Sequence, residues 1–167
     1  MELKSVEPQV LALADALRRR GWHMASAESC TGGLIAAACT AVAGSSDWFE
    51  RGFISYSNAA KTAMLGVDAA LIAKHGAVSE AVARAMAQGA VERAGVELGV
   101  AVTGIAGPGG GTPGKPVGLV WLALAMRTPA GAIQLQAERL QLQGDRAAVR
   151  EQTVRIALQR LLSTMAS

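Results

Sequence analysis

The 167-residue sequence has few aromatic residues and few charges. Aromatic side chains make up 4% of the chain, which disfavours a surface that stacks on nucleic-acid bases. Hydrophobic residues make up 51% and charged residues 17%, and this composition disfavours a disordered chain. The two cysteines, Cys30 and Cys39, do not form a disulfide framework. There is no signal-peptide core, and the apolar run 117–126 is too short to span a membrane as a helix. We therefore expect a cytoplasmic protein that is not bound to a membrane.

The net charge of +3 predicts a mild preference for anions, such as small molecules that carry phosphate. The densest basic run is 18–20, at the end of the first expected helix, where the helix dipole favours cations. This run therefore indicates a solvated helix end rather than a nucleic-acid site.

Segments with helical and strand patterns alternate along the chain. We expect helices over 7–20, 31–43, 58–65, 69–75 and 79–94, and a last one capped by Asp145. We expect strands over 22–27, 49–56, 99–105, 117–126 and 132–142. The order predicts an α/β fold with a mixed sheet, and the length favours a single domain over 1–167.

Three polar stretches follow expected strands. Ser29 lies just past one strand end, Tyr56 lies at another, and 103–107 ends a third. Ligands of such sheets bind off the carboxyl ends of the strands, so the three stretches are expected to meet in one cleft.

Ser29 lies in the sequence Ala-Glu-Ser-Cys-Thr-Gly-Gly, residues 27–33. Its hydroxyl could cap the following helix, or it could be a nucleophile whose oxyanion meets helix N-terminal amides. Gly32 and Gly33 would let a substrate approach the backbone. Cys30 is a rival nucleophile that we expect to point elsewhere, and Glu28 could support either a lysine base or the backbone of this motif.

A serine nucleophile needs a base. His23 and His75 have no evident orienting carboxylate and are interpreted as structural. Lys61 lies about one helical turn after a strand end, in an apolar setting. To act as a base its pKa must fall by roughly three units from about 10.4, through desolvation or nearby positive charge. A surface lysine remains the alternative, while the Tyr56 hydroxyl could relay a proton or orient the base.

The loop 107–116 is rich in glycine and proline. Residues 109–115 match the start of a P-loop, but Pro116 stands where Ser or Thr must bind Mg²⁺, and a strand follows instead of a helix. The loop could bind an anion through its amides or be a plain connection. The sequence has no metal-binding pattern.

Six motifs occur in a specific order and resemble the CinA C-terminal domain family. They are residues 27–33, 44–46, 56–61, 65–67, 76–79 and 103–108. The resemblance covers nearly the whole chain and implies a three-layer α/β/α domain without metal or cofactor, which pairs as a homodimer. The implied activity is hydrolysis of nicotinamide mononucleotide (NMN) to nicotinate mononucleotide and ammonia, in pyridine nucleotide recycling.

The resemblance also implies roles for individual residues. Ser29 would be the nucleophile, Lys61 the general base, and Tyr56 an aid to proton transfer. The carboxamide end or oxyanion site would be lined by Thr31, Gly32, Gly33, Thr103 and Gly104. The loop with Gly107 and Gly110 would close over the nucleotide, and Arg146, in the matching Gly-Asp-Arg of 144–146, would bind the phosphate.

Two rival functions remain open. One is a non-catalytic nucleotide-binding module that regulates a partner, since a fold does not determine function. The other is an amidase that acts on a different pyridine amide or nucleoside. A binding module would not need Ser29, Tyr56 and Lys61 together, which favours the enzyme.

Overall fold

A computed structural model describes residues 2–166 of the chain. Its centre is a five-stranded sheet with the strand order β2-β1-β3-β4-β5. The strands are β1 (Met24–Glu28), β2 (Phe49–Ile54), β3 (Leu98–Gly104), β4 (Leu119–Arg127) and β5 (Ile133–Gln141). β1 pairs in parallel with β2 and β3, whereas β4 is antiparallel to both β3 and β5. The predicted mixed sheet is confirmed.

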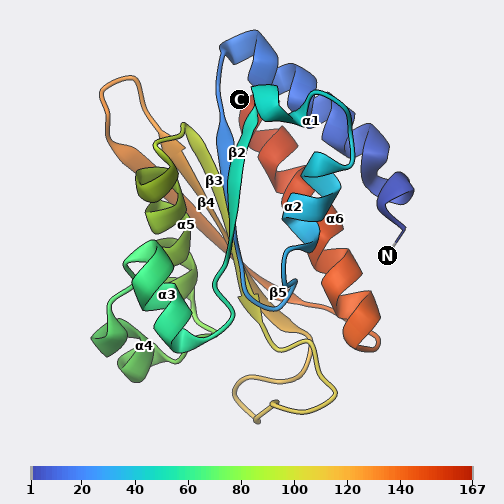
Figure 1. The fold of residues 1–167 in the computed structure, drawn as a ribbon. Coiled ribbons are helices and arrows are strands. Elements are labelled where there is room, and N and C mark those ends of the chain that lie inside the picture. The colour runs from blue at the N-terminus through green and yellow to red at the C-terminus, as the bar shows by residue number, and fades with distance from the viewer. Residues whose placement is uncertain (1, 167) are drawn as a thin grey trace.

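Helices cover both faces of the sheet (Figure 1). One face carries α1 (Glu7–Arg20), α2 (Leu34–Thr40) and α6 (Arg146–Ala166), and the other carries α3 (Asn58–Leu65), α4 (Ala69–His75) and α5 (Glu80–Ala94). Two short 3-10 helices, η1 (Leu3–Val6) and η2 (Ser45–Asp47), complete the elements. The fold is therefore a three-layer α/β/α arrangement, as expected. Among the described residues, no helix has the length and apolar character needed to cross a membrane.

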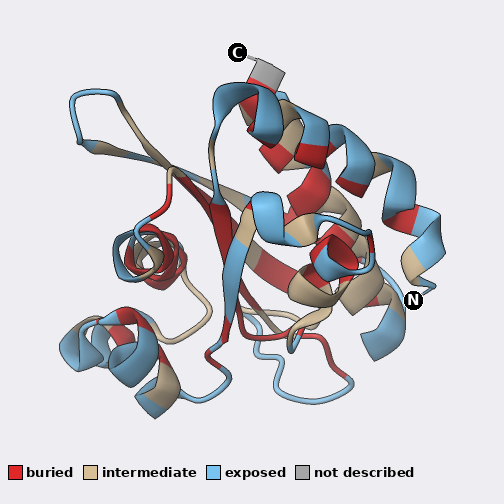
Figure 2. Cartoon of the chain, turned by 45° about the horizontal axis from the view of Figure 1, so that its top comes forward, coloured by how far each residue is buried: buried red, intermediate tan, exposed pale blue. Residues whose placement is uncertain are grey.

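The core consists of one apolar cluster on each face of the sheet, because neighbouring strand residues point to opposite faces. Met24, Leu98 and Val100 pack towards α1 and α6, whereas Ala25 and Ala101 pack towards α5. Figure 2 shows the buried residues concentrated in the strands and on the inner sides of the helices. Both sheet faces are thus covered at the centre.

Small residues let α5 lie close to the sheet and to α3. A Cβ on Gly99 would lie 2.7 Å from Cγ2 of Val91, and a Cβ on Gly89 would overlap the carbonyl oxygen of Leu65. The abundance of Ala and Gly in the sequence therefore corresponds to close packing of helix on sheet.

The element boundaries differ from the expected ones near the strand ends. α2 begins at Leu34 rather than at 31 and ends at Thr40 rather than at 43. The reason is that Gly32 and Gly33 have φ values of 60° and 100°, which form a turn that a helix does not permit. β2 ends at Ile54, two residues before the expected end at Tyr56, so the next two carbonyl groups leave the ladder. These carbonyl groups contribute to the site described below.

Replacement of Gly89 by Ala tests this packing. The added methyl group collides with the backbone of Leu65, which cannot move as a flexible side chain could. We expect Gly89→Ala to lower the free energy of unfolding by about 1–3 kcal/mol, although Ala is the better helix former. Urea denaturation measures the change, and Gly114→Ala, where a Cβ meets no atom within 4 Å, is the matched control. Equal stabilities of the two variants would contradict this description.

Candidate functional site

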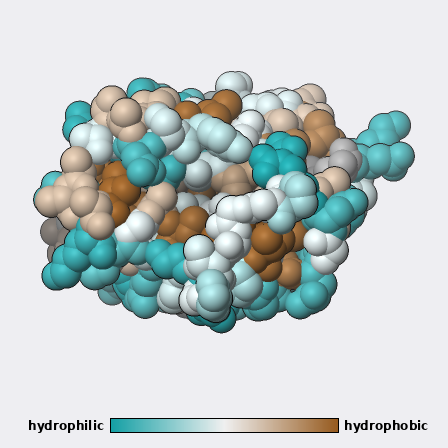
Figure 3. Space-filling model, turned by 90° about the horizontal axis from the view of Figure 1, so that it is seen from below, coloured by the Kyte–Doolittle hydropathy of each residue, from teal (hydrophilic) through white to brown (hydrophobic). Residues whose placement is uncertain are grey.

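A cavity of about 210 Å³ lies at the carboxyl ends of β1, β2 and β3. In Figure 1 this is the lower end of the sheet, and Figure 3 shows the molecule from that side, with apolar patches between hydrophilic side chains. The cavity is lined by Ser29, Cys30, Tyr56, Asn58, Lys61, Ala77, Val78, Thr103, Gly104, Ala106 and Arg146. The three polar stretches that follow the strands therefore meet, as expected.

The amine of Lys61 is buried at the bottom of this site, with 1% of the residue exposed. Its Nζ lies 3.1 Å from Oγ of Ser29, 3.0 Å from the carbonyl oxygen of Ser55 and 3.3 Å from that of Tyr56. In this geometry the amine can donate to all three oxygens. Once neutral, it can keep its hydrogen bonds to the two carbonyl groups and accept that of the serine hydroxyl with its lone pair. The three contacts thus suit a lysine that acts as a base towards Ser29.

Burial lowers the pKa of Lys61 below its ordinary value, because desolvation disfavours the charged amine. The neighbouring Cys30 opposes this shift. In residues 2–166 no carboxylate forms an ion pair with Lys61 that would keep the amine protonated. The alternative of a surface lysine is therefore wrong.

The start of α3 determines where Lys61 points. The Ser57 side chain caps this helix by accepting a hydrogen bond from the N–H of Ala60, and Gly66 ends it at φ 71°. Lys61 and Leu65 lie four residues apart, so both project from the buried face of the helix. The apolar neighbours of Leu65 and the polar end of β2 thereby fix the amine against the strand ends.

Glu28 organises the turn that carries Ser29. Its carboxylate is fully buried and accepts hydrogen bonds from the N–H groups of Gly33, Ile35 and Ala36, at 2.8–3.0 Å. It also accepts hydrogen bonds from the hydroxyl groups of Thr31, at 2.6 Å, and Ser26, at 3.2 Å. Of the two roles considered for Glu28, the structure shows support of the backbone. Glu28, and not Ser29, satisfies the N-terminus of α2.

Cys30 is among the residues that line the cavity, but it is buried and belongs to the apolar cluster on the α1 and α6 face of the sheet. Burial raises the pKa of its thiol to about 12. At neutral pH the thiol is therefore protonated and a poor nucleophile.

Tyr56 contacts the base through its backbone rather than its ring. Its carbonyl oxygen accepts from Lys61, while its hydroxyl accepts a 3.0 Å hydrogen bond from Arg146. Arg146 also donates to the carbonyl oxygen of Gly107, at 3.0 Å. Arg146 thereby joins the end of β2 to the glycine-rich loop at the rim of the cavity.

The other candidate residues lie at different depths. Thr103 and Gly104 line the cavity, but the Thr103 hydroxyl donates to the carbonyl oxygen of Ala77. Thr31 is buried with its hydroxyl on Glu28, so its side chain positions the turn and does not line the cavity. Gly32 and Gly33 shape the same turn, next to Arg150 and Ile54 respectively.

The glycine-rich loop borders the site but does not cover it. Gly107 holds Arg146 through its carbonyl oxygen, whereas the exposed Gly110 lies further out in the loop. Lys115 donates a 2.7 Å hydrogen bond to the carbonyl oxygen of His75 and so fastens the loop to the end of α4. The segment that follows is strand β4, which agrees with the rejection of a P-loop.

Arg150 lies near the site but is not among the site residues that the sequence predicts. It donates to the carbonyl oxygen of Thr31 at 2.9 Å, and with Arg146 it lines a second cavity of about 490 Å³. Its position four residues after Arg146 in a helix was the available signal, since such residues share a face. In the described part of the chain, no group of His, Cys, Asp and Glu side chains is arranged to hold a metal ion.

Comparison with known proteins gives a consistent result. The family model of the CinA C-terminal domain matches residues 7–165. A nicotinamide-nucleotide amidohydrolase PncC from Enterobacter agglomerans is 46% identical, with 97% of this chain and 96% of that protein covered. A CinA-like protein from Citrifermentans bemidjiense is 59% identical over 87% of this chain. The match covers only 34% of that protein's length.

A solved structure has the same fold. The crystal structure of a competence-damaged protein (CinA) superfamily protein from Klebsiella pneumoniae superimposes with a TM-score of 0.90. The two chains are 39% identical, and the match covers 96% of this chain and 98% of the other.

Replacement of Glu28 by Gln tests how the nucleophile turn is held. The amide group would direct N–H donors at a site where five donors already converge, so some buried N–H groups would lose their acceptor. We expect Glu28→Gln to lower the free energy of unfolding by about 1–3 kcal/mol. Chemical denaturation measures it, with the exposed Glu50→Gln as control, which should change stability by about 0.5 kcal/mol or less. A Glu28→Gln protein as stable as the control would refute this role.

Proposed function

The chain belongs to the CinA C-terminal domain family, and on this premise we propose that it hydrolyses the carboxamide of NMN to nicotinate mononucleotide and ammonia. The observation that carries the proposal is the buried amine of Lys61, which has no ion-pair partner among residues 2–166 and lies 3.1 Å from the Ser29 hydroxyl. The printed name of the Enterobacter agglomerans relative, which matches almost end to end, supports the substrate.

In the first step, Oγ of Ser29 attacks the carboxamide carbon while Nζ of Lys61 accepts the hydroxyl proton. The carbonyl groups of Ser55 and Tyr56 hold the other two N–H bonds of the amine, so its lone pair is directed at the serine. The pyridinium ring of the substrate withdraws electrons from the carbonyl. Its positive charge also opposes protonation of Lys61, which helps to keep the amine neutral.

The negative charge that develops on the amide oxygen needs hydrogen-bond donors. The N–H groups of Cys30 and Thr31 follow the nucleophile. Among the described residues the Thr31 N–H donates to no acceptor, and the Cys30 N–H has only its own side chain as a partner. We assign these two N–H groups to the oxyanion. Glu28 contributes indirectly, because its hydrogen bonds hold the turn in which they lie.

The intermediate then collapses. The C–N bond breaks, protonated Lys61 gives its proton to the departing nitrogen, and ammonia leaves an acyl-Ser29 ester. A water molecule, deprotonated by the same lysine, attacks this ester. The proton returns to Oγ of Ser29, and the acid is released. One water is consumed for each ammonia formed.

The remaining residues bind the substrate in this proposal. Thr103 and Gly104 face the carboxamide end, and Arg146 at the cavity rim binds the phosphate. The alternative of a non-catalytic regulatory module is disfavoured, because binding alone needs no buried amine on a serine hydroxyl. A homodimer in the cytoplasm that serves pyridine nucleotide recycling completes the proposal.

Variants of the two reacting residues provide the first test. We expect Ser29→Ala to lower kcat for ammonia release from NMN by about 10⁴-fold or more and Lys61→Met by about 10²–10⁴-fold. Lys61→Arg should be as inactive as Lys61→Met, because a guanidinium remains protonated. Lys74→Met, at an exposed lysine, is the control. Ammonia release that survives Ser29→Ala would disprove the Ser29 mechanism but not the deamidase activity.

The pH dependence provides a second test. The pKa of Lys61 is lowered, so the neutral, active fraction rises with pH and saturates below the pH at which an ordinary lysine titrates. We expect kcat/KM for NMN to rise on one limb whose midpoint lies below 10.5. A rate that stays constant until pH values typical of an exposed lysine, or that falls as pH rises through this limb, would exclude Lys61 as the base.

A further inference from the structure

A second cavity of about 490 Å³ adjoins the catalytic one and shares Ala106 and Arg146 with it. Its walls are the glycine-rich loop, with Pro108 and Val117, and the first turn of α6. A ligand that fills the catalytic cavity can therefore extend past Arg146 into this space.

Arg150 is the unexplained residue of this second cavity. One of its terminal nitrogens donates to Thr31, but its Nε is buried without a hydrogen-bond partner within the described residues. Buried polar groups in native proteins nearly always have partners, so such an atom calls for a ligand or another explanation. The guanidinium fork matches the oxygens of a phosphate, to which it can donate two hydrogen bonds at once.

The charges around the cavity favour an anion. Arg146 and Arg150 lie four residues apart on α6, and among residues 2–166 neither forms an ion pair with a carboxylate. Their mutual repulsion is relieved by a bound anion. Asp145 also lines the cavity, but its carboxylate is engaged as the cap of α6, where it accepts from the N–H of Ala148. The two arginines outweigh its single charge.

We propose that this second cavity is the subsite for the phosphate group of the substrate, and that the guanidinium of Arg150, beside that of Arg146, binds this phosphate. The inference rests on the proposed function, because it takes the pyridine end of the same ligand to lie at Ser29. It adds to that function a residue and a place: the phosphate is held by Arg150 below the glycine-rich loop. The remaining hydrogen bond of Arg150 connects the phosphate site to the nucleophile turn.

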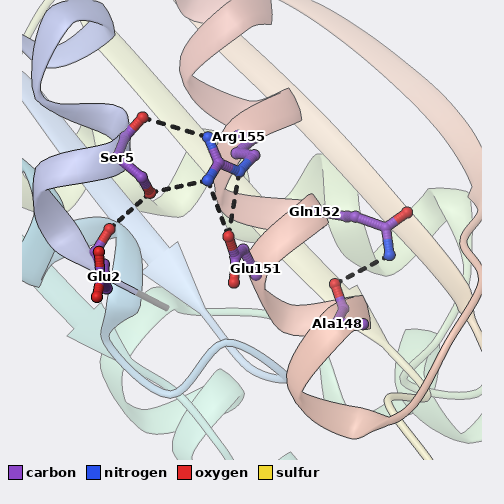
Figure 4. A network of polar contacts seen from close by, with 6 residues as sticks. All are labelled: Glu2, Ser5, Ala148, Glu151, Gln152 and Arg155. Carbon is purple, nitrogen blue, oxygen red and sulfur yellow. Dashed lines mark hydrogen bonds and ion pairs between the residues drawn. The ribbon is translucent and has the colours of Figure 1, made fainter.

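The test compares two substrates that differ only in the phosphate, NMN and nicotinamide riboside. Arg150→Met should lower kcat/KM for NMN by about 10- to 100-fold, mainly through KM, because it removes charge-assisted hydrogen bonds. In the same variant, kcat/KM for nicotinamide riboside should change by less than about 3-fold, the effect of losing one hydrogen bond between neutral groups. The matched control is Arg155→Met on the same helix, where the arginine is held by Ser5 and Glu151 (Figure 4) and lines neither cavity.

If Arg150 acts only by holding Thr31, Arg150→Met would lower kcat/KM equally for both substrates. That result would overturn the inference. Arg150→Lys keeps the charge but lacks the fork, and it should show a smaller loss that is again confined to NMN. This variant decides the question if Arg150→Met does not fold. An equal loss for both substrates in Arg150→Lys would also count against the phosphate site.

Binding of ribose 5-phosphate separates this inference from the proposed function. Calorimetry should detect ribose 5-phosphate binding to the parent and to Arg155→Met, weaker binding to Arg150→Lys, and none to Arg150→Met at the same concentration. Ribose, which lacks the phosphate, should bind to none of these proteins. If the parent releases no ammonia from NMN yet shows this pattern, the deamidase fails and the phosphate site stands. If the parent is active but ribose 5-phosphate binds equally to all variants, the phosphate site fails and the deamidase stands.

Discussion

The site depends on one buried amine that forms no ion pair with any residue from 2 to 166. Lys61 lies among a serine hydroxyl and two backbone carbonyls, and its burial there disfavours the charged form. Removing a lysine amine from water is costly when it stays charged, so the pKa falls instead. The fold must therefore bring the end of β2, the start of α3 and the Ser29 turn together without a nearby acid that pairs with the amine.

The other polar residues maintain this arrangement. Glu28 is the buried carboxylate nearest in sequence to Ser29, and five hydrogen-bond donors direct it to α2 and the nucleophile turn. Arg146 connects Tyr56 to Gly107, and Arg150 connects α6 to Thr31. Three segments far apart in the sequence are thereby joined around the cavity, and the two arginines supply positive charge at its outer end.

Much of the fold and the site was predictable from local pattern. The alternation of strands and helices gave the mixed sheet, and the polar residues after three strands indicated the cleft. The predictions that failed concern residues whose structure is determined by long-range contacts. Gly32 and Gly33 delay the start of α2, and the Tyr56 hydroxyl turns to Arg146. The burial of Lys61 and the unpartnered Nε of Arg150 depend on packing between distant elements, which no short motif encodes.

The most direct measurement is the titration of the lysine side chains by NMR, with ¹³C and ¹⁵N at the Cε and Nζ positions. The chain has four lysines, and the Lys61 signal is identified by its loss in Lys61→Met. The account predicts that Lys61 titrates at lower pH than Lys4, Lys74 and Lys115. A Lys61 that loses its proton together with the other three would contradict the claim that this buried amine is the base.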